Sequence, residues 1–205
     1  MFAFRLATPD HAEQIARIVI DTSEGVVGSL FDGLVPGVSS ETLLSAIFMK
    51  GEGAYTTDNV ILSEEEEVIT SLLFAYPAAE HKVLSLMAGL LSSARLDPVR
   101  PFLERAVPDS LFVNTLWVAG HLRGQGFGDA LLLEAAGRCR RLGFTRISLF
   151  CWNDNEYAMR LYTRHGFEMA EYIPREHLPL AGHNMGGSLL CKNLEASLHG
   201  RKIHD

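Results

Sequence analysis

The sequence predicts an α/β protein of the α+β kind, with a mixed, partly antiparallel central sheet flanked by helices. Three observations support this prediction. Segments with strand-like and helix-like hydrophobic periodicity alternate along the chain. The glutamates Glu64–Glu67 join two apolar strand-like segments, which is typical of an antiparallel hairpin. Residues 77–109, between the third and fourth predicted strands, combine several prolines with apolar residues at helical spacing, which predicts a helical insertion.

The elements before the insertion follow from local signals. Phe2, Phe4 and Leu6 alternate as a first strand. Thr8 is a typical N-cap and Pro9 a typical first helical residue, so a helix should begin there. We then expect a long loop or broken helix over residues 23–40, a helix over 41–49, and strands over 60–62 and 68–76.

The insertion and the segments after it complete the predicted order. The apolar stripe of the insertion consists of Val83, Leu86, Met87, Leu90 and Ala94. After the insertion we expect a strand at 111–118, a helix at 129–142, a strand at 147–151, a helix that ends at Arg164, and strands at 167–173 and 188–191. Residues 195–205 should form a flexible tail.

The composition predicts one domain over residues 1–205. The chain is 47% hydrophobic and 21% charged, so it can bury a core without disulfides or a structural metal. Its densest apolar run, residues 83–91, is far shorter than the ~20 residues that cross a bilayer, so we expect no membrane partner. The net charge of −7 argues against a dedicated nucleic-acid binder.

Cysteine usage and the first residues bear on location. Cys139, Cys151 and Cys191 are an odd number of widely spaced cysteines, which is typical of a reducing cytoplasm and not of a disulfide scaffold or a zinc site. Residues 1–5 contain no basic segment ahead of an apolar core, so we expect no signal peptide. These observations predict a cytoplasmic protein that holds no metal.

The segment from Val118 to Asp129 is the most informative in the chain. A predicted strand runs into glycines at 124, 126 and 128 and then directly into a helix. These glycines let the backbone turn sharply and direct successive N–H groups inward. The helix N-terminus adds partial positive charge, and Arg123 adds a cation. Together these features predict a site for a phosphate or pyrophosphate.

The glycine spacing excludes two common phosphate-binding motifs. A dinucleotide fingerprint requires a third glycine three residues after Gly126, where this chain has Asp129. A phosphate-binding loop of the Walker type ends in Gly-Lys-Ser/Thr, which is absent here. The remaining pattern, Arg-Gly-x-Gly-x-Gly over residues 123–128, resembles the acyl-CoA signature of the GNAT superfamily of N-acetyltransferases.

A second segment carries the same resemblance. Val118 lies five residues before Arg123, as in that family. Residues Asn155–Phe167 read N-x-x-A-x-x-L-Y-x-x-x-G-F, which is similar to the family's later signature. The resemblance is firm over 111–173 and extends in element order over 1–76, but it does not cover the insertion. It implies acetyl-CoA as cosubstrate.

The resemblance implies roles for particular residues. The strand before the loop should carry a bulge and separate from its neighbour, so that backbone groups of Leu116 and Val118 pair with the pantetheine arm. A backbone N–H near Val118 would polarise the thioester carbonyl. The pyrophosphate would be held by the loop residues Arg123, Gly124, Gln125, Gly126, Phe127 and Gly128.

Two residues of the second signature have a functional and a structural interpretation. Tyr162 corresponds to a tyrosine that faces the CoA sulfur, where a phenol can protonate the leaving thiolate. It could instead be part of an ordinary buried face together with Tyr157, Ala158 and Leu161. Asn155 either contacts the cofactor or only caps the helix that follows.

The sequence departs from the family pattern at the predicted base. The strand 111–118 contains no carboxylate, and its polar residues are Asn114 and Thr115. Strand parity places Asn114 on the face of Leu116 and Val118, where it could orient a water or the acceptor but could not act as a base. The other candidates for a base are Glu80, His81, Glu176 and His177. Asp129, a second departure, should point outward as a helix cap.

The acceptor is predicted only as a class. The resemblance implies direct attack on acetyl-CoA by a primary amine of a small molecule, amino acid or peptide, in a pocket formed by residues 21–40 and 174–187. The insertion could cover this pocket or form a homodimer face. One alternative is a catalytically silent CoA-binding or metabolite-sensing module, which turnover would distinguish. Another is an interaction protein whose glycine loop binds nothing.

Overall fold

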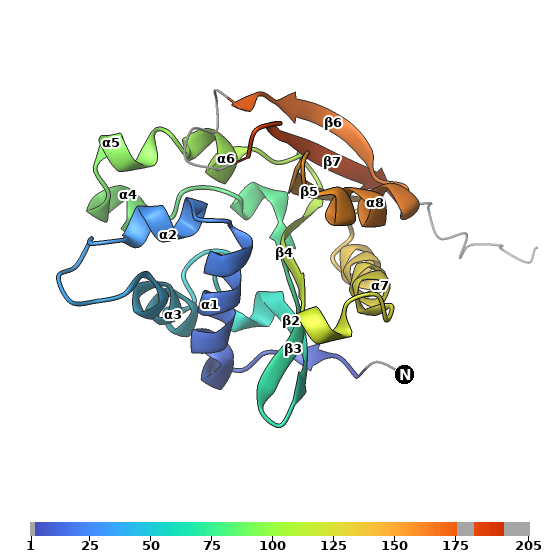
Figure 1. The fold of residues 1–205 in the computed structure, drawn as a ribbon, viewed down its shortest axis with the longest axis horizontal. Coiled ribbons are helices and arrows are strands. Elements are labelled where there is room, and N and C mark those ends of the chain that lie inside the picture. The colour runs from blue at the N-terminus through green and yellow to red at the C-terminus, as the bar shows by residue number, and fades with distance from the viewer. Residues whose placement is uncertain (1–2, 176–182, 195–205) are drawn as a thin grey trace, which may run out of the picture.

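A computed structural model describes residues 3–175 and 183–194 and places their strands in one sheet (Figure 1). The strands are β1 Arg5–Leu6, β2 Val60–Glu65, β3 Val68–Pro77, β4 Leu111–Val118, β5 Arg146–Trp152, β6 Glu168–Ile173 and β7 Gly187–Asn193. Their order in the sheet is β1-β2-β3-β4-β5-β7-β6, and only β4 and β5 pair in parallel. This mixed, mostly antiparallel sheet confirms the predicted fold class.

Helices cover both faces of the sheet. On one side lie α1 Ala12–Thr22, α2 Val26–Phe31 and α3 Ser40–Lys50, and on the other lie α7 Phe127–Arg141 and α8 Glu156–Arg164 (Figure 1). Single-turn helices are present at 9–11, 57–59, 78–80 and 120–122. No helix within the described ranges is long and apolar enough to cross a membrane.

The two faces of the sheet belong to two separate hydrophobic clusters. Along β3, Leu72, Phe74 and Tyr76 lie in the cluster that includes α1–α3, whereas Leu73 and Ala75 lie in the cluster that includes α7 and α8. This alternation is the period of two expected for a strand buried on both faces. We call the first the α1 face and the second the α7 face.

The insertion consists of three short helices, α4 Ser85–Leu90, α5 Ser93–Leu96 and α6 Arg100–Glu104. Its buried apolar side chains join the α1-face cluster: Leu84, Met87, Leu91, Leu96, Val99 and Leu103. The predicted single stripe is wrong at Leu90, which is 54% exposed, and at Ala94. The helical period does not continue, because the backbone becomes extended at Leu91. Much of the apolar surface of the insertion is therefore covered by this chain itself.

The acidic turn is a tight hairpin, as predicted. Glu66 and Glu67 connect β2 to β3 with φ values of 49° and 65°. Left-handed conformations at both central residues are typical of the two-residue turns that match strand twist. The predicted elements 41–49, 111–118 and 167–173 agree with the observed ones to within two residues. The predicted tail, 195–205, lies outside the described residues.

Close packing in the sheet gives a stability prediction. A Cβ on Gly187 would overlap the ring of Phe150. Gly187→Ala should therefore lower the free energy of unfolding by about 1–3 kcal/mol, because an overpacked core must shift. Gly89→Ala is the matched control, since Gly89 lies in a helix with open space around it. Thermal unfolding of both variants checks this, and an equal effect of the two would contradict it.

Candidate active site

The parallel strands β4 and β5 pair only at their beginnings. Leu111–Val113 lie opposite Ile147–Leu149, and no pairing continues beyond that point although both strands do. β4 runs on to Val118 along β3, and β5 runs on to Trp152 along β7. The separation that the resemblance implied is therefore present, and we refer to it as the splay.

A β-bulge lies where the splay begins. Phe74 of β3 pairs with Thr115 and Ala75 pairs with Val113, so Asn114 is the extra residue. The extra residue shifts the strand parity. Asn114 donates an amide hydrogen bond to the Tyr76 hydroxyl (2.9 Å) on the α1 face.

The predicted face of Asn114 is therefore wrong. Leu116 and Val118 pack against the α7-face cluster, on the opposite side of the sheet from the Asn114 side chain. Simple alternation fails because the bulge adds one residue between Val113 and Thr115. Asn114 consequently faces the side of the splay opposite α7 and its glycine loop.

The backbone of β4 beyond the bulge presents an unpaired edge to the splay. Ala119 donates its N–H to the Thr70 carbonyl of β3 (2.9 Å). Since backbone groups alternate along a strand, those of Leu116 and Val118 point the other way, toward β5. The Val118 carbonyl accepts a hydrogen bond from Arg123 Nε (3.1 Å). The predicted pantetheine-pairing groups thus lie at the edge where β5 is not paired.

The glycine loop joins this edge to α7. Gly124 and Gly126 have φ values of 77° and 87°, in the left-handed region that favours glycine. Gln125 fixes the turn by donating to the His121 carbonyl (2.9 Å). Because α7 begins at Phe127, the N–H groups of its first turn lie directly after the loop. The loop therefore has the backbone geometry of an anion site.

The start of α7 is held tightly against α8. A Cβ on Gly128 would lie 3.1 Å from the Leu161 side chain, so this glycine permits close helix packing. Asp129 accepts hydrogen bonds from Arg164 (2.6 Å) and His165 (2.7 Å) at the end of α8. These two partners hold the pKa of Asp129 below its usual value. The expected helix cap is therefore wrong: Asp129 forms a cross-helix ion pair with Arg164.

The Asp129 ion pair gives a pH-dependent prediction. Because its pKa is lowered by folding, Asp129 stabilises the protein above its ordinary pKa of 3.8. This contribution is lost as the pH falls through the lowered value. The carboxylate side chain is 40% exposed, so Asp129→Asn should cost at most about 1 kcal/mol at pH 7 and less than that at pH 2.

Denaturant titration of Asp129→Asn at the two pH values checks this prediction. Glu168→Gln is the control, because Glu168 is exposed and has no ion pair within the described part of the chain. A loss of stability in Asp129→Asn that is the same at both pH values would rule out the ion pair as its cause.

Tyr162 is the buried residue of α8. It is 8% exposed and its ring packs edge-on against Phe167, with the centroids 5.6 Å apart. Burial raises the pKa of its phenol well above the ordinary value, and the nearby Cys151 thiol adds to this effect. Burial also raises the pKa of Cys151 to about 12. Tyr162 is therefore a protonated group beside the end of β5; Tyr157, by contrast, is 84% exposed and not part of the expected buried face.

Asn155 performs the structural role that the sequence left open. Its side-chain oxygen accepts a hydrogen bond from the Ala158 N–H (3.1 Å), which caps α8. A contact between Asn155 and the cofactor remains a prediction.

Of the candidates for a base, the described residues include Glu80, which is half-buried, and His81. His81 is 8% exposed, and burial lowers its pKa to about 4, so it is neutral and enclosed. Both of its ring nitrogens are hydrogen-bonded, which excludes the predicted role as a base that contacts the acceptor. Glu176 and His177 lie outside the described residues.

A charged cluster on the predicted acceptor side was not foreseen as a unit. His183 lies between the carboxylates of Glu24 and Asp154 and stacks on Trp152, with the ring centroids 4.3 Å apart. Glu24 lies between α1 and α2, Trp152 ends β5 and Asp154 follows it, and His183 lies before β7. Only tertiary contact brings them together, so sequence spacing carried no signal for it.

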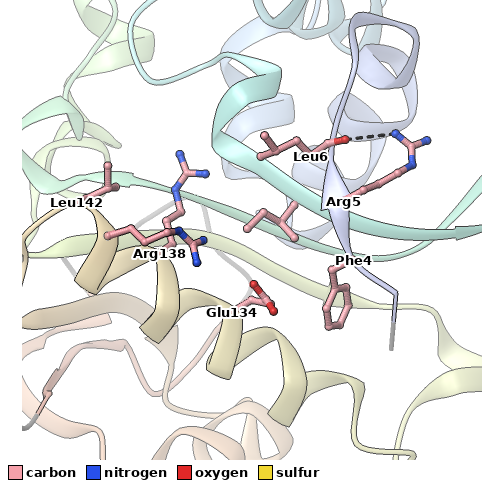
Figure 2. Close-up of a pocket in the computed structure, with 8 residues that line it drawn as sticks. Phe4, Arg5, Leu6, Glu134, Arg138 and Leu142 are labelled. Atoms are coloured by element: carbon pink, nitrogen blue, oxygen red, sulfur yellow. Dashed lines mark hydrogen bonds between the residues drawn. The ribbon is translucent and has the colours of Figure 1, made fainter. Parts of the chain in front are cut away.

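A surface pocket of about 360 Å³ lies elsewhere, between β1, β2 and the C-terminal half of α7 (Figure 2). Its lining residues are Phe4, Arg5, Leu6, Ile61, Glu134, Arg138, Arg141 and Leu142. Figure 2 shows Glu134 and Arg138 extending from α7 toward the first strand. No predicted site residue lines it, so it is separate from the splay and its loop.

Solved structures share this fold. An N-acetyltransferase from Staphylococcus aureus Mu50 is 19% identical, with a TM-score of 0.69 over 91% of this chain and 99% of that one. The Salmonella typhimurium structure of yncA with its cofactor acetyl-CoA is 15% identical, with a TM-score of 0.57 over 98% of this chain and 99% of that one. Diaminobutyrate acetyltransferase EctA from Paenibacillus lautus, in complex with L-2,4-diaminobutyric acid and coenzyme A, is 15% identical, with a TM-score of 0.58 over 93% of both chains.

The family assignment rests on a sequence match. No curated protein sequence matches this chain. The model of the acetyltransferase (GNAT) family matches residues 59–167, more than half of the chain. This range covers the hairpin, the bulged strand, the glycine loop and α7 through α8. The chain belongs to the acetyltransferase (GNAT) family.

Proposed function

We propose that the protein transfers the acetyl group of acetyl-CoA to a primary amine of a small molecule, amino acid or peptide, by direct attack in a ternary complex. The observation that carries this proposal is the unpaired edge of β4 at Leu116 and Val118, which leads directly into the glycine loop and the N-terminus of α7. An edge followed by an anion-binding loop fits an extended pantetheine arm that ends in a pyrophosphate.

Particular residues would hold acetyl-CoA, which supplies a thioester. The backbone of Leu116 and Val118 would pair with the pantetheine arm, and the Val118 N–H would stabilise charge that develops on the thioester oxygen. The pyrophosphate would be bound by the N–H groups of residues 124–128 and by the Arg123 guanidinium, whose Nε is already fixed on the Val118 carbonyl. Asn155 would add a contact from the start of α8.

Proton transfer is assigned to Tyr162 on the α7 face of the splay and to water on the acceptor side. Tyr162 would donate its proton to the departing thiolate, which is supported by a raised pKa that keeps the phenol protonated. The acceptor must lose a proton, and β4 offers no carboxylate to take it. We assign this proton to water, while Asn114 orients the amine.

The acceptor class is proposed from charge. The carboxylates of Glu24 and Asp154, on the predicted acceptor side, support a cationic amine. Diaminobutyrate acetyltransferase, which shares the fold, binds such an amine. The net charge of −7 supports this class of partner over nucleic acid, and the free thiols of Cys139, Cys151 and Cys191 support a cytoplasmic location.

The first experiment is thermal unfolding with and without acetyl-CoA, followed by a thiol-release assay over pooled amines. A ligand at a hundredfold excess over its Kd stabilises the native state by about 2.7 kcal/mol, so the melting temperature should rise. Amine-dependent thiol release should follow. A shift with no amine-dependent release would instead favour a CoA-binding sensing module, and no shift would refute the assigned role of the loop.

A further inference from the structure

A chain of hydrogen bonds leads from the bulge into the insertion. The Thr115 hydroxyl donates to Asn114 Oδ1 (3.0 Å), and Asn114 Nδ2 donates to the Tyr76 hydroxyl (2.9 Å). The Tyr76 hydroxyl lies 3.0 Å from His81 Nδ1, and His81 Nε2 lies 3.1 Å from the Phe102 carbonyl. Tyr76, His81 and Thr115 are buried, whereas Asn114 is half-buried.

The Phe102 carbonyl, at the end of this series of hydrogen bonds, fixes which atom donates in each of them. A carbonyl oxygen only accepts, so His81 Nε2 carries the proton that bonds to Phe102. Burial keeps the ring neutral, so Nδ1 is bare and accepts the Tyr76 proton. The Tyr76 oxygen must then accept from Asn114, which requires the NH₂ end of the amide. The Asn114 carbonyl oxygen is thereby directed away from Tyr76.

Phe102, in α6, also contacts β5. The Phe102 ring packs edge-on against Phe150 (4.9 Å) and parallel to Trp152 (6.1 Å), between centroids. His81 is held in addition by stacking on Phe112, 3.9 Å away. The insertion thus connects the α1-face sides of β4 and β5 at the splay.

We propose that Tyr76 and His81 are positioning residues, which hold the Asn114 amide so that its carbonyl oxygen accepts a hydrogen bond from the acceptor amine. The proposal rests on the proposed acetyl transfer. Asn114 Oδ1 has two lone pairs, of which Thr115 occupies one. A reversed amide would present N–H donors to the donor groups of the amine and would misorient its attack.

A double-mutant cycle tests this proposal. Tyr76→Phe releases the amide orientation and should lower kcat/KM for the amine by ~10-fold or more, with the KM for acetyl-CoA changed less than ~2-fold. In an Asn114→Asp background the same change should cost less than ~2-fold, because a carboxylate presents oxygen in either orientation. Tyr55→Phe is the control, since Tyr55 packs on Phe74 as Tyr76 does but has no bond to Asn114.

The cycle separates the possible results. An equal loss from Tyr76→Phe in both backgrounds, or an equal loss of acetyl-CoA affinity, would overturn the positioning role and leave a packing role. If Tyr76→Phe does not fold, His81→Gln is compared in the same two backgrounds. The glutamine side chain can reach the Phe102 carbonyl but has no Nδ1 to accept the Tyr76 proton. Turnover of the unmodified protein tests the proposed function separately, since the positioning role is judged by the ratio between backgrounds.

Discussion

Replacing Gly124 with valine should weaken acetyl-CoA binding by about 10- to 100-fold. Gly124 has a φ of 77°, which a β-branched residue adopts only with strain of about 1–3 kcal/mol. Relief of that strain would rotate the adjacent peptide groups, so their N–H groups would no longer point toward the proposed position of the phosphate. Each charge-assisted hydrogen bond lost in this way costs about 1.5–3 kcal/mol. Calorimetric titration with acetyl-CoA measures the change.

Gly143→Val separates the loss of the phosphate site from the loss of stability. Gly143 has a φ of 80° and, as at Gly124, a Cβ added there would have no atom within 4 Å. It follows the other end of α7, whose 15 residues span about 22 Å. The two variants should lower the melting temperature to a similar extent, but only Gly124→Val should lose affinity for acetyl-CoA. Comparable affinity losses would show that helix stability, not loop geometry, governs binding.

The loop could be predicted because its geometry is encoded locally. Glycine at 124 and 126 permits left-handed backbone whatever lies around it, and both residues adopt it. A strand end, such glycines and a helix start within a few residues specify most of an anion site without tertiary information. The strand 111–118 was likewise predicted with its exact bounds, because its apolar residues signal a strand.

The environment of Asn114 could not be predicted in this way. Its face depends on a bulge that only the pairing with β3 reveals, so local alternation gave the wrong side. The surroundings of His81 and His183 also depend on tertiary contacts. The hydrogen-bond partners of His81 lie 5 and 21 residues away along the chain. Asp154, which bonds to His183, lies 29 residues away. The residues that we propose for the acceptor side are therefore those for which sequence spacing is least informative.

Replacing Tyr162 with phenylalanine should lower kcat by about 100-fold and leave the KM for acetyl-CoA nearly unchanged. General acid catalysis contributes about 10²–10⁴-fold when the acid is correctly placed. The Tyr162 hydroxyl has no hydrogen-bond partner within residues 3–175 and 183–194, so its removal should hardly affect folding. Tyr157→Phe is the control on the same helix, because Tyr157 is 84% exposed and the Arg160 guanidinium lies over its ring. Steady-state kinetics of the two variants checks the assignment.

The pH dependence of kcat distinguishes an acid from a packing residue. An acid acts in its protonated form, and burial raises the pKa of Tyr162 above its ordinary value of 10.0. Activity should therefore rise with pH as the amine loses its proton, and it should show no decline due to Tyr162 between pH 7 and 10. A decline in that range that disappears in Tyr162→Phe would mean that the phenol ionises more easily than its burial implies. A proportional loss of kcat and acetyl-CoA affinity would instead assign Tyr162 to packing against Phe167.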